Sequence, residues 1–417
     1  MQFNVKTATR MGMSDRICIT GIGVVSPIGI GKEEFLASLK SGRSGIEEVR
    51  EFDTRFSKSK EGGMVRSFHP KDFIPAGKIR RLDRASQFAI AASKLALADA
   101  QFSVTQENSA RVGIVFGSGF CGLSSSEEFH RGQILKGFLD LNPMLFPNTV
   151  PNAASSYASI ELGIQGVNST LVQSFCTAEA AMLFACDQLR KGKANLILTG
   201  GVDELSEFLF RGFSELNFLG TDQGRGERSR PYDRTRNGLI LGEGAGILAI
   251  ETEEHAKSRG ARIYGYILSY NLVGKSPKGD GSEDIGRSIK MVLKGMEKVS
   301  VDYISGAGNS SKILDALEAR GVKKAFQSRY AEVPVSSIKS MIGEAIASGG
   351  TRMVANVLSM GYGFIPPTIN YLIPDPACDL RYIVSQKLDQ EIRTILHLGI
   401  SPGDSFASIL MGVEWSQ

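Results

Sequence analysis

A single cysteine, Cys176, stands where a strand-like segment meets a helix-like segment. Residues 170–173 have the pattern of a strand and residues 177–191 that of a helix, so the thiol falls on a sharp turn between them. The free N–H groups and the dipole at the start of a helix stabilise a thiolate, the nucleophilic form of cysteine. The position therefore predicts a covalent acyl-transfer nucleophile, which also needs a base and an oxyanion hole.

The sequence offers no histidine as a base for this cysteine. The chain has only 4 histidines in 417 residues, and none falls beside the cysteine turn. His69 lies in a loop and His130 on a segment before residue 140. His255 lies in a charged helix and His397 in a late strand. The sequence thus predicts the frame of an acyl-transfer site without all of its catalytic groups.

Composition narrows the class of protein. At ~150 residues per domain the length fits two or three domains, and 42% apolar residues with 47 glycines indicate a large core. A net charge of +4 is too small for a nucleic-acid-binding protein. The five scattered cysteines form no CxxC pair, which argues against zinc and a disulfide framework and favours the cytoplasm. No apolar run approaches the ~20 residues of a membrane span.

Alternating strand and helix patterns predict an α/β fold built from two similar halves. Residues 1–15 are expected to be a flexible extension, followed by an N-terminal half at 16–255 and a C-terminal half at 256–417. Buried strands are expected at 112–116, 194–198, 244–250, 301–304 and 395–400. Helices are expected at 82–97, at 311–320 with Gly321 as its stop, and at 342–358.

Four sequence blocks, in order, resemble the elongating β-ketoacyl-ACP synthases. They are Phe146 to Gly166, the turn Thr199-Gly200-Gly201-Val202-Asp203, the segment from Arg230-Pro231-Tyr232-Asp233 through Gly242-Glu243-Gly244-Ala245-Gly246, and Val335 to Gly343. The resemblance covers nearly everything from Arg16 onward. It implies the thiolase fold, with duplicated α/β halves in an αβαβα layered arrangement.

The resemblance also implies a Cys-His-His site, and the chain departs from it. Cys176 matches the nucleophile. The first histidine aligns with Ala307 and the second with Glu344, which has a carboxylate in place of an imidazole. Glu344 is expected either to act as a general acid or base or to be paired with a lysine. Lys339 and Glu318 match the family's polar support, or form a buried ion pair that holds the fold.

The oxyanion loop is a further departure. The family's second donor is the backbone N–H of a phenylalanine, and aligning back from Ala407 places Pro402 there. Proline has no N–H to donate. Losing one such donor typically costs ~10²–10³ in rate.

These residues leave two functions open. One is a chain-length-factor-like partner of a full ketosynthase in a type II fatty-acid or polyketide system, with little or no activity of its own. The other is an acyltransferase or atypical condensing enzyme that uses Cys176 as acyl acceptor and Glu344 as base. Either implies an acyl carrier protein as partner, substrates on its phosphopantetheine arm, no cofactor or metal of the chain's own, and a homodimer or a heterodimer. The basic cluster Lys78, Arg80, Arg81 and Arg84 would meet an acidic carrier helix or be a solvated face.

Overall fold

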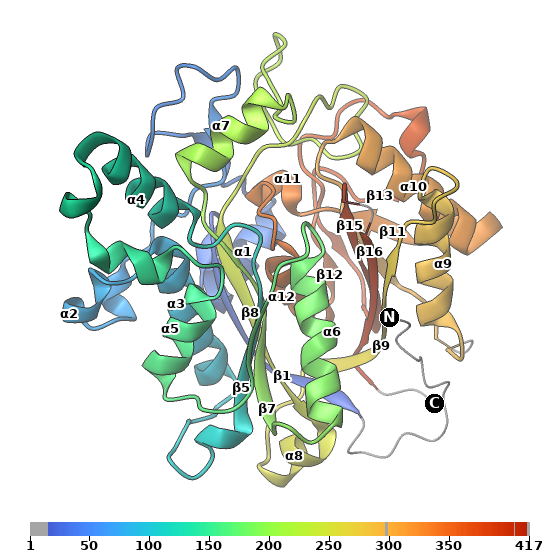
Figure 1. The fold of residues 1–417 in the computed structure, drawn as a ribbon. Coiled ribbons are helices and arrows are strands. Elements are labelled where there is room, and N and C mark those ends of the chain that lie inside the picture. Colours follow the sequence, from blue (N-terminus) through green and yellow to red (C-terminus); the bar gives the residue numbers. More distant parts are fainter. Residues whose placement is uncertain (1–15, 297–298, 404, 415–417) are drawn as a thin grey trace.

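The computed structural model describes residues 16–296, 299–403 and 405–414, and the expected N-terminal extension lies outside them. Within this part of the chain one sheet of 12 strands runs through the molecule (Figure 1). Its N-terminal side is β1 (Ile17–Ser26), the short β2 (Gly29–Ile30) that pairs only with β1, β5 (Val112–Gly117), β6 (Asn168–Leu171), β7 (Leu196–Asp203) and β8 (Gly244–Thr252). Its C-terminal side is β9 (Gly265–Gly274), β10 (Tyr303–Ser305), β11 (Pro334–Ser336), β13 (Arg381–Tyr382), β15 (Thr394–Ser401) and β16 (Ser405–Gly412).

The two sides repeat one pairing pattern. On the N-terminal side β6, β5 and β7 are parallel, and β8 and then β1 follow antiparallel. On the C-terminal side β11, β10 and β15 are parallel, and β16 and then β9 follow antiparallel. The two sides join where the first residues of β1 pair with β9. This repetition is the duplicated α/β arrangement that the sequence predicts.

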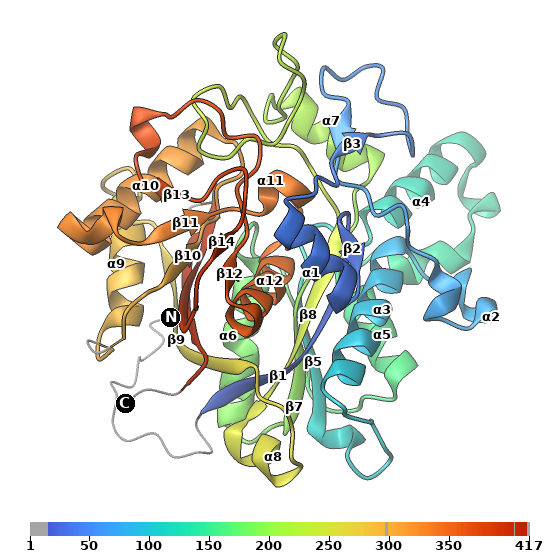
Figure 2. The ribbon, with the colours of Figure 1, turned by 180° about the vertical axis from the view of Figure 1, so that it is seen from behind.

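Helices form three layers around the strands (Figures 1 and 2). The outer face of the N-terminal strands packs against α3 (Arg84–Asp99) and α5 (Ala153–Leu162), and the outer face of the C-terminal strands against α9 (Ser282–Leu293) and α10 (Lys312–Phe326). Between the two sets of strands lie α6 (Thr177–Arg190) and α12 (Gly349–Tyr362), whose small side chains fill the central core. The result is the predicted αβαβα order of layers.

Two of the predicted helices differ from the observed ones. Gly321 does not end a helix, because α10 continues to Phe326; a Cβ on Gly321 would lie 2.4 Å from Ile285 Cγ2, so this glycine lets α10 approach α9 closely. The helix expected at 342–358 is broken. A short α11 (Lys339–Ile342) ends at Gly343, whose φ is 76°, and α12 begins at Gly349. The intervening segment carries Glu344.

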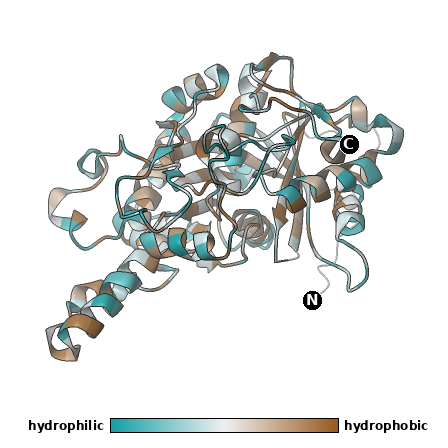
Figure 3. Cartoon of the chain, turned by 90° about the horizontal axis from the view of Figure 1, so that it is seen from above, coloured by the Kyte–Doolittle hydropathy of each residue, from teal (hydrophilic) through white to brown (hydrophobic). Residues whose placement is uncertain are grey.

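The remaining helices lie around this body. They are α1 (Lys32–Ser41), α2 (Ala76–Ile79), α4 (Leu123–Lys136), α7 (Glu207–Glu215) and α8 (Glu253–Ser258). The helix α4 stands away from the sheet (Figure 1), and the arm that it forms ends in apolar residues (Figure 3). In the described part of the chain, no helix combines the length and the apolar character that crossing a bilayer requires.

Candidate active site

The cysteine turn is closed by its own backbone. Ser174 takes a φ of 46°, and the N–H of Cys176 donates to Gln173 O (3.3 Å). The Thr177 hydroxyl donates to Leu171 O (2.6 Å) and accepts from the Gln173 N–H (3.1 Å). Cys176 is therefore the residue directly before the first turn of α6, as the sequence predicts. Its side chain is fully buried, and Sγ donates to Ser405 O (3.3 Å).

Two features of the surroundings oppose the thiolate that the helix position of Cys176 favours. Burial raises the pKa of Cys176 well above its usual value, and the negative charge of Glu179 raises it further. Lys339, the Ala407 N–H that faces the sulfur, and Arg352 act in the opposite direction without reversing the shift. Cys176 is thus a neutral thiol at physiological pH, because the hydration free energy that a buried thiolate loses exceeds the stabilisation that these groups provide.

Glu179 belongs to a buried cluster that the sequence analysis missed. Its Oε1 lies 2.9 Å from His397 Nε2 and 3.6 Å from Arg352 Nη1, and all three side chains are buried. Burial by itself raises the pKa of Glu179, but the hydrogen bond from His397 and the charge of Arg352 outweigh it, and the pKa lies below its usual value. Glu179 is therefore ionised. The signal in the sequence was a carboxylate on an otherwise apolar helix turn, three residues after the cysteine.

His397 is neutral and cannot act on Cys176. Burial, followed by the charge of Arg352, lowers its pKa to about 4. The side-chain amide of Asn356 donates to Nδ1 (3.1 Å), which assigns the ring proton to Nε2, facing Glu179. Both ring nitrogens are therefore engaged, one by Asn356 and the other by Glu179.

The loop that carries Ala307 is held by a carboxylate and a tyrosine. The N–H of Ala307 donates to Glu318 Oε1 (2.6 Å), and the hydroxyl of Tyr232 donates to Glu318 Oε2 (2.8 Å). A Cβ on Gly308 would lie 2.3 Å from the Tyr232 ring, so the loop is pressed onto this side chain. Ala307 offers only a methyl group at its position.

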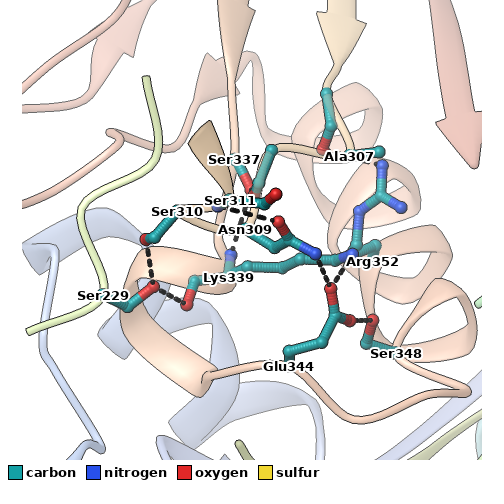
Figure 4. A network of polar contacts seen from close by, with 12 residues as sticks. Ser229, Ala307, Asn309, Ser310, Ser311, Ser337, Lys339, Glu344, Ser348 and Arg352 are labelled. Carbon is teal, nitrogen blue, oxygen red and sulfur yellow. Dashed lines mark hydrogen bonds and ion pairs between the residues drawn. The ribbon is translucent and has the colours of Figure 1, made fainter. Parts of the chain in front are cut away.

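Glu344 lies at the centre of a buried polar network (Figure 4). Its Oε2 accepts from Lys339 Nζ (2.6 Å) and Asn309 Nδ2 (2.8 Å), and its Oε1 accepts from Ser348 Oγ (2.8 Å). The Lys339 and Glu344 side chains are 3% and 1% exposed. Each oxygen is thus engaged, which is the arrangement of a paired structural carboxylate rather than of a free base.

Lys339 therefore pairs with Glu344 and not with Glu318, which corrects the expected Lys339–Glu318 ion pair. Lys339 neutralises Glu344, and a second cation, Arg352, lies near a second carboxylate, Glu179. Arg352 Nη2 also donates to three backbone carbonyls, Ser305 O, Gly306 O and Leu398 O (2.7–2.8 Å). Its guanidinium thus lies beside Ala307, as Figure 4 shows.

The loop between β15 and β16 covers the cysteine turn. Gln173 Nε2 donates to Ser405 Oγ (3.4 Å), and a Cβ on Gly403 would lie 3.8 Å from Ser174. Pro402 is exposed in this loop and has no N–H to donate. Its equivalence to the family's phenylalanine stays a prediction, and the backbone N–H that faces the sulfur belongs to Ala407.

The other cysteines have structural surroundings. Cys18, Cys121, Cys186 and Cys378 are all buried and unbridged, and burial is the largest cause of the raised pKa of each. Among the residues that the structure describes, no group of three or more histidine, cysteine, aspartate or glutamate side chains could hold a metal ion.

Comparison with protein families gives two matches that together span most of the chain. Residues 14–256 match the beta-ketoacyl synthase N-terminal domain, and residues 264–372 match the C-terminal domain. Among curated proteins, the chain is 32% identical over 393 residues to 3-oxoacyl-[acyl-carrier-protein] synthase 2 of Staphylococcus aureus, covering 92% of this chain and 94% of that protein. The protein of the same name from Synechocystis is 33% identical over 385 residues, covering 89% of this chain and 91% of that protein.

Solved structures extend the comparison. "The ishigamide ketosynthase/chain length factor" superposes with a TM-score of 0.88 at 28% identity, covering 96% of this chain and 99% of that one. A type II PKS acyl-carrier protein in complex with its ketosynthase, AntDE:AntF, gives 0.85 at 27% identity, with the same coverage.

Proposed function

We propose, on the premise that the chain belongs to the beta-ketoacyl synthase family, that it is a chain-length-factor-like partner of a full ketosynthase in a type II fatty-acid or polyketide system. In this role the chain shapes and completes a paired assembly. The condensation itself takes place at the cysteine and histidines of its sister. Substrates would reach the pair on the phosphopantetheine arm of an acyl carrier protein in the cytoplasm.

The observation that carries the proposal is the Glu344 network. A condensing site needs neutral hydrogen-bond donors for the enolate formed by decarboxylation, whereas Glu344 places a carboxylate at the second histidine position. Lys339, Asn309 and Ser348 engage both of its oxygens. Ala307 offers no side-chain donor at the first histidine position. The residues at these two positions therefore stabilise the protein interior and are not suited to stabilising a developing negative charge.

Two surfaces support pairing with another subunit. Strand β6 is the last strand of the sheet on its side, so its outer edge has unpaired backbone groups. The tip of the α4 arm exposes Ile134, Leu135, Phe138 and Leu139, with exposed fractions of 82%, 74%, 74% and 100%. Apolar side chains gathered in this way mark an interaction surface. We propose that a sister subunit, or a second copy of this chain, covers the β6 edge and the α4 arm.

The proposed carrier-docking cluster is partly neutralised within the chain. Lys78 pairs with Glu161, and Arg84 pairs with the buried Glu243. Arg80 and Arg81 are exposed beside them. These two arginines are therefore the part of the cluster that we propose contacts an acidic carrier protein.

A reconstitution experiment tests the proposal. The chain is co-expressed with a ketosynthase that has the cysteine and both histidines, and condensation is followed with acyl and malonyl carrier proteins. We expect a stable pair whose rate is unchanged by Cys176→Ala in this chain. Replacing the sister's nucleophilic cysteine should lower the rate by ~10³-fold or more. Condensation by this chain alone, or loss of activity with Cys176→Ala in the pair, would contradict the proposal.

The second candidate function rests on the retained cysteine. Lys339 and Arg352 both lower the pKa of Cys176, although burial and Glu179 outweigh them. A bound substrate that weakened the effect of the Glu179 charge on Cys176 would lower the pKa of the thiol. The thiol would then be able to accept an acyl group and pass it on. Glu344, the proposed base of this alternative, is held by Lys339, and this arrangement favours the partner role.

A further inference from the structure

The first turn of α6 carries a carboxylate on the same face as the cysteine. Cys176 precedes the helix and Glu179 follows three residues later. Residues three apart on a helix have Cβ atoms about 5–6 Å from each other. Both side chains are fully buried. A charge at this separation, shielded from water, acts strongly on the ionisation of its neighbour.

The surrounding chain is shaped around this carboxylate. A Cβ on Gly349, the first residue of α12, would lie 2.5 Å from Glu179 Oε1, and a Cβ on Gly399 in β15 would lie 2.9 Å from Glu179 Cδ. Both glycines therefore leave the volume that the carboxylate fills. Since the elements on either side of α6 make room for it, Glu179 is a built feature of the core.

The charge of Glu179 is fixed by its partners. His397 donates through Nε2, and its tautomer is set by Asn356. Arg352 supplies a cation that is itself anchored on three backbone carbonyls. A carboxylate that receives a hydrogen bond and faces a fixed cation remains ionised inside a protein.

The charged groups around the thiol have opposite signs. Glu179 faces it from α6, Lys339 from α11 and Arg352 from α12. Lys339 is neutralised by Glu344, the neutral His397 contacts Glu179, and Glu318 accepts from the Ala307 N–H. Glu179 is thus the anion closest along the chain to the sulfur, and it opposes the helix dipole that would otherwise favour a thiolate.

We infer that Glu179, held in place by His397 and Arg352, is a positioning residue that keeps Cys176 as a neutral thiol. This role of Glu179 concerns only the ionisation of Cys176. It does not depend on the proposed partner function, because the same two residues would be present in a paired subunit and in an acyltransferase. Removing this one charge should make Cys176 easier to ionise, although burial continues to oppose ionisation.

Thiolate absorbance near 240 nm, measured against pH, tests the inference. The contribution of Cys176 is the difference between a protein and its Cys176→Ser counterpart. We expect Cys176 in the native background to ionise only near the alkaline limit of folding. In the Glu179→Gln background the midpoint should fall by about 2 pH units, the size of one charge at this distance in a partly shielded interior.

Asp187→Asn is the matched control. It removes the same charge from the same helix, on a half-buried residue that bonds to Tyr270. We expect it to leave the Cys176 midpoint where it was. His397→Gln, which keeps the Glu179 charge, should also leave the midpoint high, whereas a general loosening of the core would lower it.

If Glu179→Gln does not fold, the variant Glu179→Gln/Arg352→Gln removes both charges at once. Because Glu179 acts on Cys176 more strongly than Arg352 does, the midpoint should still fall, by less than with Glu179→Gln. A folded Glu179 variant whose Cys176 midpoint equals that of the native protein would overturn the inference and leave burial as the sole cause.

Discussion

The N-terminal and C-terminal halves contribute opposite walls of one site, and they differ in what they retain. The N-terminal wall keeps the cysteine turn, closed by local hydrogen bonds among Leu171, Gln173, Cys176 and Thr177. The C-terminal wall has Ala307 and Glu344 at the positions where the sequence alignment predicts the family's histidines, and a Lys339–Glu344 ion pair lies in the interior. Each of these two buried charges thus has a partner of opposite sign.

The same comparison extends to the two buried carboxylates. Glu344 on the C-terminal wall has a cation and two neutral donors, so its charge is balanced where it stands. Glu179 on the N-terminal wall has His397 and Arg352 on one oxygen, and within the described residues its Oε2 has no hydrogen-bond partner. Both oxygens of Glu344 are therefore engaged, whereas one oxygen of Glu179 is not.

The largest expected effect comes from breaking the C-terminal ion pair. Lys339→Met leaves the Glu344 charge buried without its cation, and should lower the free energy of unfolding by about 3–5 kcal/mol. Lys339→Met/Glu344→Met removes both charges and should recover most of that loss. Denaturant unfolding of the three proteins measures this. If the double variant were as unstable as the single one, packing rather than charge would explain the pair.

The second effect is a pH dependence at the contact between Glu179 and His397, which joins the two halves. The pKa of His397 is lowered from 6.5 to about 4 in the folded protein. Between these values the unfolded chain binds a proton that the folded chain does not, so stability falls as the pH falls through this window. The loss should amount to about 3 kcal/mol by pH 4.

His397→Gln isolates this contribution from the other titrating groups. Buried carboxyls such as Asp203, whose pKa is raised to about 6 by burial, act with the opposite sign in the same window. The difference between native and His397→Gln stability, measured from pH 7 to pH 4, should therefore shrink as the pH falls. A difference that is constant with pH would contradict the neutral histidine.

The smallest effect concerns the space around Glu179. Gly349→Ala places a methyl group against its carboxylate and should cost about 1–3 kcal/mol. Gly361→Ala, in the same helix α12, meets nothing within 4 Å and should stabilise the protein by about 0.5–1 kcal/mol. Thermal unfolding of the two variants compares them. Equal changes would show that the volume at Gly349 is not reserved for Glu179.

The sequence predicted the features that depend on short stretches of chain. The strand-to-helix turn at Cys176 and the repeated halves follow from local patterns and motif order, whereas the substitution of both histidine positions stays a prediction. Helix ends were less predictable. Gly321 has the pattern of a stop, yet it is used for close packing against Ile285, because a tertiary contact overrides the local preference of glycine.

The charge pattern of the site could not be predicted in the same way. Glu179 and His397 are 218 positions apart, and nothing in either segment indicates the other. Glu344 was expected either to act as an acid or base or to pair with a lysine, and in the structure it pairs with Lys339. The carboxylate that raises the pKa of Cys176 is Glu179, which no sequence pattern singled out. Pairing between buried ions is a property of the folded packing and not of spacing along the chain.

The most direct test of the account is the intact mass of the chain after incubation with an acyl carrier protein that bears an acyl thioester. The native protein and Cys176→Ala are compared under conditions that acylate a full-triad ketosynthase. The account predicts no adduct on either protein, because Cys176 is a buried neutral thiol without a base. A mass increase on the native protein alone would contradict it and would make the chain an acyl-accepting enzyme.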